Sequence, residues 1–333
     1  MGPARPDFDY GNARLRVRKA ALLDRADYGQ LLDNDLQGAL GAIAGGPYGS
    51  DLEAVRERFS GLRALHEAVR RHLARALEDM RALYADSART LVDLLLSKWD
   101  LQNLLTLLRG RAAAAPVDET LASLVPIGAL DEPAAAEAAG QSDAGRAAEL
   151  LVTRRLPTPD LARALARAWP AYVRTEDLAN LEHALVIDHI AYVRARVAGF
   201  GDAGEPLARE LEREVEARDI LTALRPAQSS RRREAVAALA GSVRDEGLRR
   251  ILRSWSPSEG LAALQDRFEH RCAGASLQLF ASDDPLGVAI PIAFAAAKEA
   301  EARNLRLIGE GLACGIDRAQ LAARLLLVGG QTR

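Results

Sequence analysis

The sequence predicts an all-α protein in which one helical module is used three times. Hydrophobic residues make up 49% of the 333 residues but aromatic residues only 5%, which indicates a large, aliphatic core. No stretch alternates apolar and polar residues with the period of two that is typical of a half-buried strand. A short polar motif followed by an apolar run also recurs three times. Together these observations favour repeated, packed helices.

The recurring motif is an acid, an Asn or Asp three residues later, and then apolar residues. On a helix that turns about 100° per residue, both polar positions share a stripe with the apolar residues four and seven after the acid. Burying such a pair without partners costs several kcal/mol, so we expect each pair to form hydrogen bonds where helices meet. The three pairs are Asp100 with Asn103, Glu216 with Asp219, and Glu301 with Asn304.

Two features of the motif leave alternatives open. A chain rich in Ala, Leu and Arg produces approximate matches by chance, and the same residues could be ordinary polar groups on helix surfaces. Asn103 and Asp219 are 116 residues apart, whereas Asp219 and Asn304 are 85 apart. A solenoid needs a short, fixed period. The spacing therefore fits an old triplication whose copies have changed length.

The first predicted module covers residues 1–112. Helical periodicity over residues 10–44, with a break at Asp24 to Asp27, predicts two helices joined by a short turn. Residues 51–109 carry apolar side chains at helical spacing almost without a breaker and predict long amphipathic helices. Gly110 and the Ala-rich stretch after it predict a connector, which places the first boundary near residue 112.

The second predicted module covers residues 113–226. Thr158, Pro159 and Asp160 form an N-cap signal for a helix over 160–168, which Trp169 and Pro170 should end. Two further helices are expected over 176–199 and 207–224. Gly and Pro residues near 201–206 separate them.

The third predicted module covers residues 227–333. A polar loop at 228–233 precedes a helix that begins near Pro257. Residues 285–297 form an apolar stretch of 13 residues in which Pro291 marks a helix start or a kink. A bilayer span needs about 20 residues, so this stretch predicts a buried helix, and any membrane association should be peripheral. The last helices are expected over 298–312 and 317–328.

Composition and motifs exclude several classes of function. The net charge of −2 argues against general nucleic-acid binding, which requires a basic surplus. The chain has no Gly-Lys pair and hence no phosphate-binding loop, so direct nucleotide binding is not expected. His66 and His72, like His183 and His189, lie six residues apart, about 120° around a helix, and do not share a ligand face. We therefore predict no catalytic residues, no cofactor site and no metal site.

The weakest alternative is an enzyme centred on Cys272 and His270. A thiol beside a histidine and Glu269 resembles a nucleophile with its base. The neighbouring sequence offers neither an Asn or Asp to orient the histidine nor an oxyanion loop.

Three segments resemble a known family. The N-terminal segment has Tyr10 with the run 13–16, Ala-Arg-Leu-Arg. The central segment has Trp99-Asp100 with Asn103 and the apolar run to Arg109. The C-terminal segment has 285–287 with Lys298, Glu299, Glu301 and Arg303-Asn304. These segments resemble the family of C subunits of A/V-type ATP synthases, whose eukaryotic relative is the d subunit of the vacuolar ATPase. The second motif copy and residues 128–170 depart most from the family pattern.

The resemblance implies a pseudo-threefold funnel of three helical modules around a central cavity. Such a protein is a non-catalytic central-stalk component of the rotor. It seats the foot of the stalk, formed by the D and F subunits, on the proteolipid ring and transmits torque. It is a peripheral protein on the cytoplasmic face of the membrane. Torque transmission requires stiffness, which suits a role for the six motif residues in holding helix junctions, with Arg303 as an ion-pair partner in the third module.

The main alternative is a soluble all-helical scaffold or adaptor unrelated to energy conversion, since a funnel of helices can bind other partners. The sequence leaves open whether the complex couples to protons or sodium ions, and whether it mainly makes or hydrolyses ATP.

Overall fold

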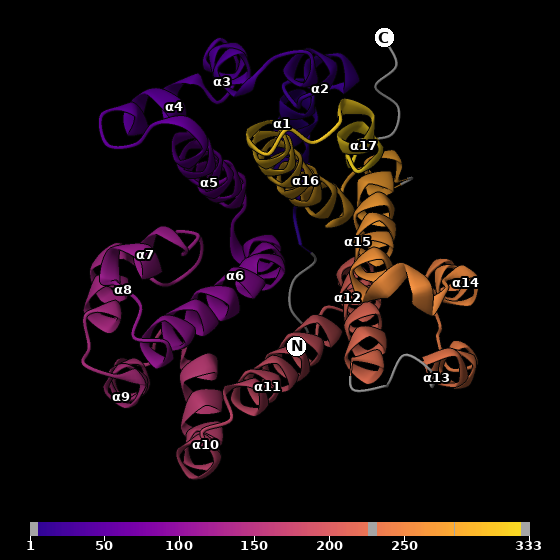
Figure 1. Ribbon diagram of the computed structural model, residues 1–333. Helices are drawn as coiled ribbons and strands as arrows, with labels where there is room; N and C mark the ends of the chain where they lie inside the picture. Colours follow the sequence, from indigo (N-terminus) through magenta and orange to yellow (C-terminus); the bar gives the residue numbers. More distant parts are fainter. Residues whose placement is uncertain (1–5, 226–231, 283, 328–333) are drawn as a thin grey trace.

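The computed structural model describes residues 6–225, 232–282 and 284–327 (Figure 1). Within these ranges the regular structure consists of helices, and no strand occurs. The predicted all-α class is therefore confirmed. The absence of strands follows from the sequence, whose apolar residues recur with a helical period and whose core is rich in Ala and Leu.

Six long helices form a closed circuit in chain order. Each packs against the next, and the last returns to the first. Figure 1 shows them surrounding the centre of the molecule. They are α5 (Gly61–Arg81), α6 (Asp86–Ala112), α11 (Leu178–Ala198), α12 (Glu205–Leu224), α15 (Gly260–Gln278) and α16 (Ala289–Ala313). Helices of about 20 residues span about 30 Å, so the circuit has the depth of a small domain.

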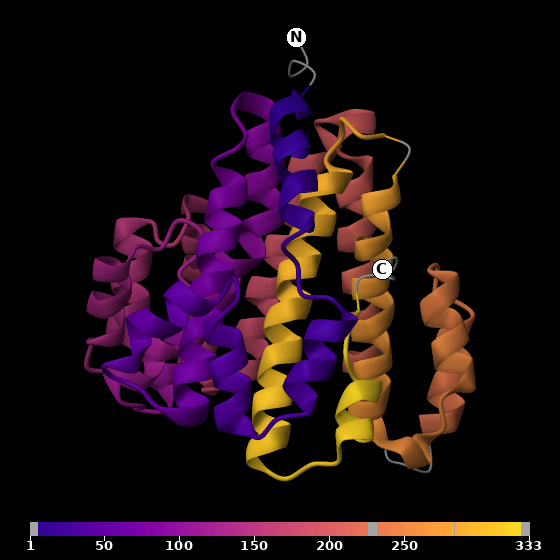
Figure 2. The ribbon, with the colours of Figure 1, turned by 90° about the horizontal axis from the view of Figure 1, so that it is seen from above.

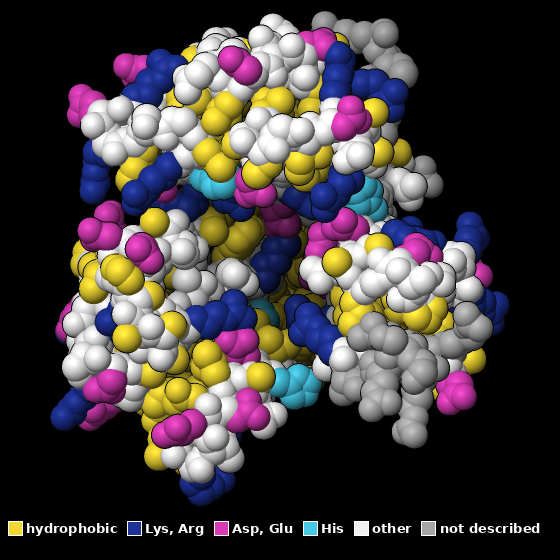
Figure 3. Space-filling view, in the orientation of Figure 1, with side chains coloured by type: hydrophobic (Ala, Val, Ile, Leu, Met, Phe, Trp, Pro, Cys, Tyr) yellow, Lys and Arg dark blue, Asp and Glu magenta, His cyan; other side chains and the backbone are white. Residues whose placement is uncertain are grey.

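The turns within this circuit gather at one end of the molecule. In the view of Figure 2 the connections between α5 and α6, between α11 and α12, and between α15 and α16 lie together at the upper end. We call this the turn end. Helix α1 (Asp9–Lys19) also begins there. Figures 1 and 3 view the molecule from the opposite end.

Shorter helices surround the circuit. Asp24 begins α2 with a capping box, because its side chain accepts from backbone N–H groups while Asp27 accepts from Asp24 N. Single Asp or Thr side chains cap several others. The shorter α-helices are α2 (Arg25–Leu32), α3 (Leu36–Ala44), α4 (Gly49–Arg56), α7 (Val117–Ala122), α8 (Glu132–Ala139), α9 (Ala144–Arg154), α10 (Pro159–Thr175), α13 (Arg232–Ala240), α14 (Glu246–Ser254) and α17 (Arg318–Ala323). Three single-turn 3₁₀ helices are η1 (Gly201–Ala203), η2 (Pro257–Glu259) and η3 (Leu279–Ala281).

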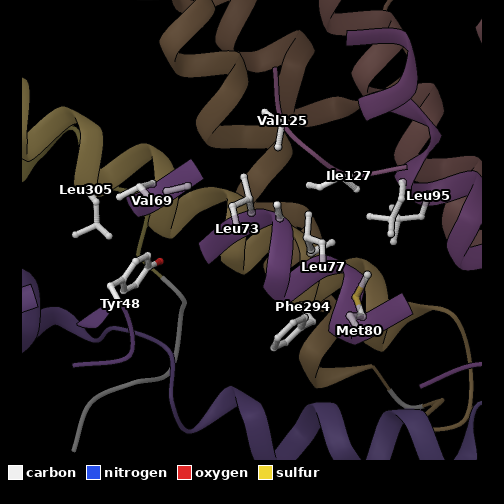
Figure 4. Close-up of a cluster of buried hydrophobic side chains, with 14 of the residues drawn as sticks. Tyr48, Val69, Leu73, Leu77, Met80, Leu95, Val125, Ile127, Phe294 and Leu305 are labelled. Atoms are coloured by element: carbon white, nitrogen blue, oxygen red, sulfur yellow. The ribbon is translucent and has the colours of Figure 1, made fainter. Parts of the chain in front are cut away.

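The largest hydrophobic cluster draws on all three predicted modules. Figure 4 shows part of it: Leu73 and Leu77 of α5 lie near Val125 and Ile127, which come from the segment after α7. Phe294 of α16 belongs to the same cluster. A second cluster lies among α6 to α11, and a third joins α12 to α15. The predicted boundaries at 112 and 226 therefore separate stretches of chain that share one core.

Several predicted elements differ from the structure. Residues 10–44 form three helices rather than two, because Asp35 caps a new helix with a hydrogen bond from Gly38 N. Helix α10 does not end at Trp169 but continues through Pro170 to Thr175, where Trp169 and Tyr172 pack with ring centroids 4.8 Å apart. The last helix ends at Ala323, before its predicted end, because the chain then extends to reach Asn304.

Only part of the apolar stretch 285–297 is the predicted buried helix, because residues 285–288 precede α16 and Leu286 is 48% exposed. From Ala289 the helix continues without a break into the predicted helix over 298–312. Pro291 lies in the first turn of α16, where the missing N–H costs no hydrogen bond, and the helix from Ala289 to Ala295 is buried. Among the described residues, no helix combines the length and hydropathy required to cross a bilayer. Residues 228–231 of the predicted polar loop and residue 328 lie outside the described ranges. The prediction is wrong for residues 232 and 233, because α13 begins at Arg232.

Candidate interaction site: backbone clamps and a central hollow

Asn103 holds the chain that returns from α7. Its Nδ2 donates to Val125 O at 2.7 Å, and its Oδ1 accepts from Val125 N at 2.9 Å. The side chain is almost fully buried. Both polar groups of one backbone residue are thus satisfied by one amide, so the returning segment is fixed to α6.

Asn304 makes the same clamp in α16. Its Nδ2 donates to Leu326 O at 2.8 Å, and its Oδ1 accepts from Leu326 N at 2.9 Å. Asn304 is fully buried. In both clamps the bound residue follows the Asn by 22 positions.

The chain between each Asn and its bound residue follows the same path. The long helix ends nine residues after the Asn, and a six-residue helix, α7 or α17, begins fourteen residues after it. Eleven residues after the Asn, Ala114 (φ 51°) and Gly315 (φ 68°) adopt the left-handed conformation. The N–H of the following residue donates to a glycine carbonyl five residues earlier. Ala115 N donates to Gly110 O and Ile316 N donates to Gly311 O, both at 2.8 Å. These matches support a common origin for the first and third copies.

The acids of the motif bind different groups. Asp100 Oδ1 accepts from Ala129 N at 2.7 Å, 29 residues along the chain. Burial raises the pKa of the Asp100 carboxyl from 3.8 to about 6, and this effect exceeds the lowering by the Ala129 hydrogen bond and by Arg81. Gly128 beside it has φ 98°, and a Cβ there would lie 2.3 Å from Asp100 Oδ1. The acid therefore fixes a tight turn that requires glycine.

The second copy keeps the acid and loses the Asn. Glu216 is half-buried, and its two oxygens accept from Arg244 N at 2.5 Å and Asp245 N at 2.8 Å. The offset of 28 to 29 residues matches that of Asp100. Asp219 is exposed and makes no hydrogen bond or ion pair within the described residues, so the expectation of a buried pair is wrong here. The chain after α12 does return to it, since Glu216 binds the backbone of Arg244 and Asp245 and α13 packs on α12, but no backbone group of the described residues binds Asp219.

Glu301 lies at the centre of a buried network. Its Oε1 accepts from Leu23 N at 2.5 Å, and its Oε2 accepts from Tyr48 Oη at 3.1 Å. Lys298, one turn earlier on α16, forms a buried ion pair with it. Glu301 thereby connects α16 to the chain between α1 and α2 and to the start of α4.

The network continues through Tyr48. Its ring stacks on His72 of α5 with centroids 3.8 Å apart, and His72 Nδ1 lies 2.9 Å from Asp51 Oδ2. Burial, followed by the charge of Lys298, lowers the pKa of His72 to about 4 despite Asp51. The sequence did not predict this network, because Tyr48 and Asp51 lie at the start of α4 and His72 lies on α5, and no periodicity relates residues on two separate helices.

Arg303 forms ion pairs outside the motif. Its guanidinium lies 3.4 Å from Asp266 Oδ1 and 3.5 Å from Glu269 Oε2, both on α15, and donates to Arg324 O at 3.1 Å. Arg303 therefore links α15, α16 and the chain after α17, and the partner of Glu301 is Lys298 instead.

A hollow of about 380 Å³ lies between the long helices. Figure 3 shows the surface recessed near the centre of the molecule, with basic side chains beside apolar ones. Its lining includes Leu73, Trp99, Asp266, Glu269, Glu299, Ala302, Arg303, Arg306, Leu307, Glu310 and Arg324. Burial, together with Arg70, lowers the pKa of Arg306. The hollow therefore combines apolar surface with both signs of charge.

Two of the described residues that line the hollow each carry a buried polar atom without a partner. Among the side chains that the structure describes, Trp99 Nε1 and Glu299 Oε1 are buried and make no hydrogen bond. The other oxygen of Glu299 accepts from Lys98 Nζ at 2.8 Å. Both atoms are shielded from solvent within the chain, so they belong to residues that line the hollow but do not themselves face it.

The geometry does not favour a thiol enzyme. Burial, and then the charges of Glu214 and Glu210, raise the pKa of Cys272 to about 12, so the thiol is protonated at neutral pH. His270 lies two residues away on the same helix, nearly on the opposite side, and its Nε2 is 3.2 Å from Arg324 O.

Comparison with known proteins identifies the family. The family model described as ATP synthase (C/AC39) subunit matches residues 11–324. The chain belongs to this family. The match includes Asn103, Asn304 and the helices that line the hollow, but it ends before Leu326, which Asn304 binds. The family resemblance predicted from the three sequence segments is thus confirmed.

Individual members of the family align along almost their whole length. The V-type ATP synthase C subunit of Thermus thermophilus is 32% identical over 331 residues, covering 95% of this chain and 97% of the relative. The V-type ATP synthase C subunit of Deinococcus radiodurans is 28% identical, covering 92% and 87%. The A-type ATP synthase C subunit of Haloferax volcanii is 25% identical, covering 96% and 97%. The family alignment is therefore not confined to one module.

Proposed function

We propose that this chain is a central-stalk component of the rotor in an A/V-type ATP synthase or ATPase. It seats the stalk foot, formed by the D and F subunits, on the membrane proteolipid ring and transmits torque without catalysing a reaction itself. In this proposal it is a peripheral protein on the cytoplasmic face of the membrane. The observation that carries the proposal is the family match over residues 11–324.

The central hollow supports a role in receiving another protein. It is lined by both apolar and charged side chains of four long helices, α5, α6, α15 and α16, and by Arg324. Protein interfaces bury such mixed surfaces and pair their polar groups. We propose that the stalk foot occupies this hollow.

The clamps support a role in transmitting torque. Asn103 and Asn304 fix returning segments to α6 and α16, and Glu301 joins α16 to the N-terminal helices. Buried, fully paired polar networks resist relative motion of the helices that they join. A circuit of helices fixed in this way would turn as one body, and we propose this as the function of the motif residues.

Purification of the tagged chain from gently solubilised membranes of its own cell tests the proposal. The expected result is recovery of a proteolipid and two stalk proteins in stoichiometric amounts. Recovery of the chain alone from the soluble fraction would refute the proposal and favour a scaffold. A variant with the exposed Asp219→Ala substitution is the matched control, since it should not change the set of recovered proteins.

A further inference from the structure

The three arginines that line the central hollow differ in their partners. Arg303 lies 3.4 Å from Asp266 and 3.5 Å from Glu269, and Arg324 lies 3.0 Å from Asp266. Arg306 lines the same hollow, but within the described residues its guanidinium makes no ion pair and no hydrogen bond. Arg306 is therefore the arginine of the lining whose charge the described chain does not pair.

The surroundings of Arg306 are unfavourable for a cation. Its side chain is half-buried on α16. Burial, followed by the charge of Arg70, lowers the pKa of the Arg306 guanidinium, and these effects outweigh the opposite effect of Glu310. Arg70 has its own partner, because its guanidinium donates to both oxygens of Glu67. A partly desolvated cation beside a second cation is costly unless an anion pairs with it.

Glu310 does not supply that anion. It follows Arg306 by four positions, a spacing at which opposite charges on a helix can meet. Its carboxylate instead lies 3.5 Å from His66 Nε2 on α5, and 58% of its side chain is exposed. Burial lowers the pKa of His66, so this histidine is largely neutral at pH 7. Because water screens an exposed carboxylate, Glu310 stabilises the neighbouring cation only weakly.

The guanidinium of Arg306 is accessible from the hollow. Its nitrogen atoms are not among the buried, unpaired atoms of the described side chains, so a group that enters the hollow can reach them. Leu73 and Leu307 belong to the same lining. Figure 3 shows basic and apolar side chains side by side in the central recess. A docked protein surface would displace water from these apolar side chains, and an ion pair formed there would be strengthened by the lower dielectric.

We infer that the protein that occupies the hollow presents a carboxylate that pairs with Arg306. The inference rests on the proposed function, in which that protein is the stalk foot. A guanidinium offers parallel N–H donors that match the two oxygens of one carboxylate. The acids of the lining outnumber its arginines by four to three, which disfavours a free anion of higher charge such as phosphate. A single carboxylate carried by a docking protein adds one negative charge at the one unpaired arginine.

Carbodiimide cross-linking of an Arg306→Lys variant in gently solubilised membranes tests this inference. The variant keeps a cation and supplies a primary amine, which the reagent joins as an amide to a carboxyl group in contact with it. We expect an amide between position 306 and a stalk protein, and the masses of the linked peptides distinguish an Asp or Glu side chain from a C-terminal carboxylate. Arg253→Lys, at an exposed position on α14, is the matched control and should give no link to a stalk protein. A link to Glu310 alone would overturn the inference.

Release of the stalk proteins from the immobilised complex provides a second measurement. Arg306→Gln should speed release about thirtyfold, because it leaves the partner's carboxylate without its cation in the interface. Glu310→Gln removes a charge from the same lining and should not speed release. Unchanged release from Arg306→Gln, in a complex whose unaltered chain retains the stalk proteins, would overturn this inference alone. Failure of the unaltered chain to retain any stalk protein would overturn the proposed function as well.

Discussion

Replacement of Asn304 by alanine tests the role of the clamps most sharply. Asn304 is fully buried, and its amide makes two hydrogen bonds to the backbone of Leu326, at 2.8 and 2.9 Å. Alanine would leave the N–H and the carbonyl of Leu326 unpaired. Each unsatisfied buried group costs about 1–3 kcal/mol. The segment can partly move toward water, so we expect a loss of about 3 kcal/mol in the local free energy of opening.

Native-state hydrogen exchange measures this loss. The amide of Leu321 in α17 is a suitable reporter, because it donates to Asp317 O and has no bond to Asn304. In Asn304→Ala it should exchange about a hundredfold faster. In Asn103→Ala the matching effect should appear at Thr120 in α7, whose amide donates to Pro116 O.

The exposed Asp219 provides the control. Asp219→Ala removes the residue of the second copy that makes no clamp, and it should change stability by less than about 0.5 kcal/mol. The reasoning would be refuted if Asn304→Ala left both the exchange of Leu321 and the thermal midpoint unchanged. Equal effects of Asn304→Ala and Asp219→Ala would refute it as well.

Three further predictions concern the neighbouring residues. Because the pKa of Asp100 is raised to about 6, the folded chain binds more protons than the unfolded chain between about pH 4 and pH 6, and stability should fall there as pH rises. Asp100→Asn keeps an acceptor for Ala129 N but has no charge to bury, so urea unfolding at pH 7 should show the variant to be about 3 kcal/mol more stable than the unaltered chain. At pH 3 the two proteins should be equally stable; the same stability difference at both pH values would contradict this. Both Gly315 and Ala114 have positive φ, which glycine adopts more easily than alanine. Gly315→Ala should therefore lower stability by about 1 kcal/mol, whereas Ala114→Gly should not. Calorimetry that found equal shifts of the thermal midpoint would argue against equivalent turns after the two clamps. Lys298→Met should cost about 3–5 kcal/mol, because it leaves the buried charge of Glu301 without its cation. Adding Glu301→Gln should restore part of that loss; a double variant whose loss of stability equals the sum of the two single losses would exclude coupling.

The long helices were predictable because a sustained period of 3.6 residues identifies them without tertiary information. The helix ends were less predictable. Helix α10 passes through Pro170, and α17 stops early because the chain after it is bound by Asn304. In both places contacts with distant residues outweigh local preference.

The motif predicted which residues form the clamps but not which backbone groups they bind. Spacing alone identified Asn103 and Asn304 as polar residues on an apolar face, whereas the bonds to Val125 and Leu326 depend on the path of the intervening chain. The same pattern did not distinguish Asp219, which is exposed although the chain after α12 returns and binds Glu216. A short motif thus specifies a helix face, but the clamp also requires the turn and short helix that follow.

The central claim is that the hollow receives the stalk foot, and photo-cross-linking from within the hollow tests it most directly. A photoreactive residue in place of Leu307, which lines the hollow, should cross-link in native membranes to a stalk protein. The same residue in place of Val173, which is 62% exposed on α10, should not. Cross-links to a stalk protein from Leu307 alone are the predicted result. Cross-links to no stalk protein, or equal cross-links from both positions, would contradict the account.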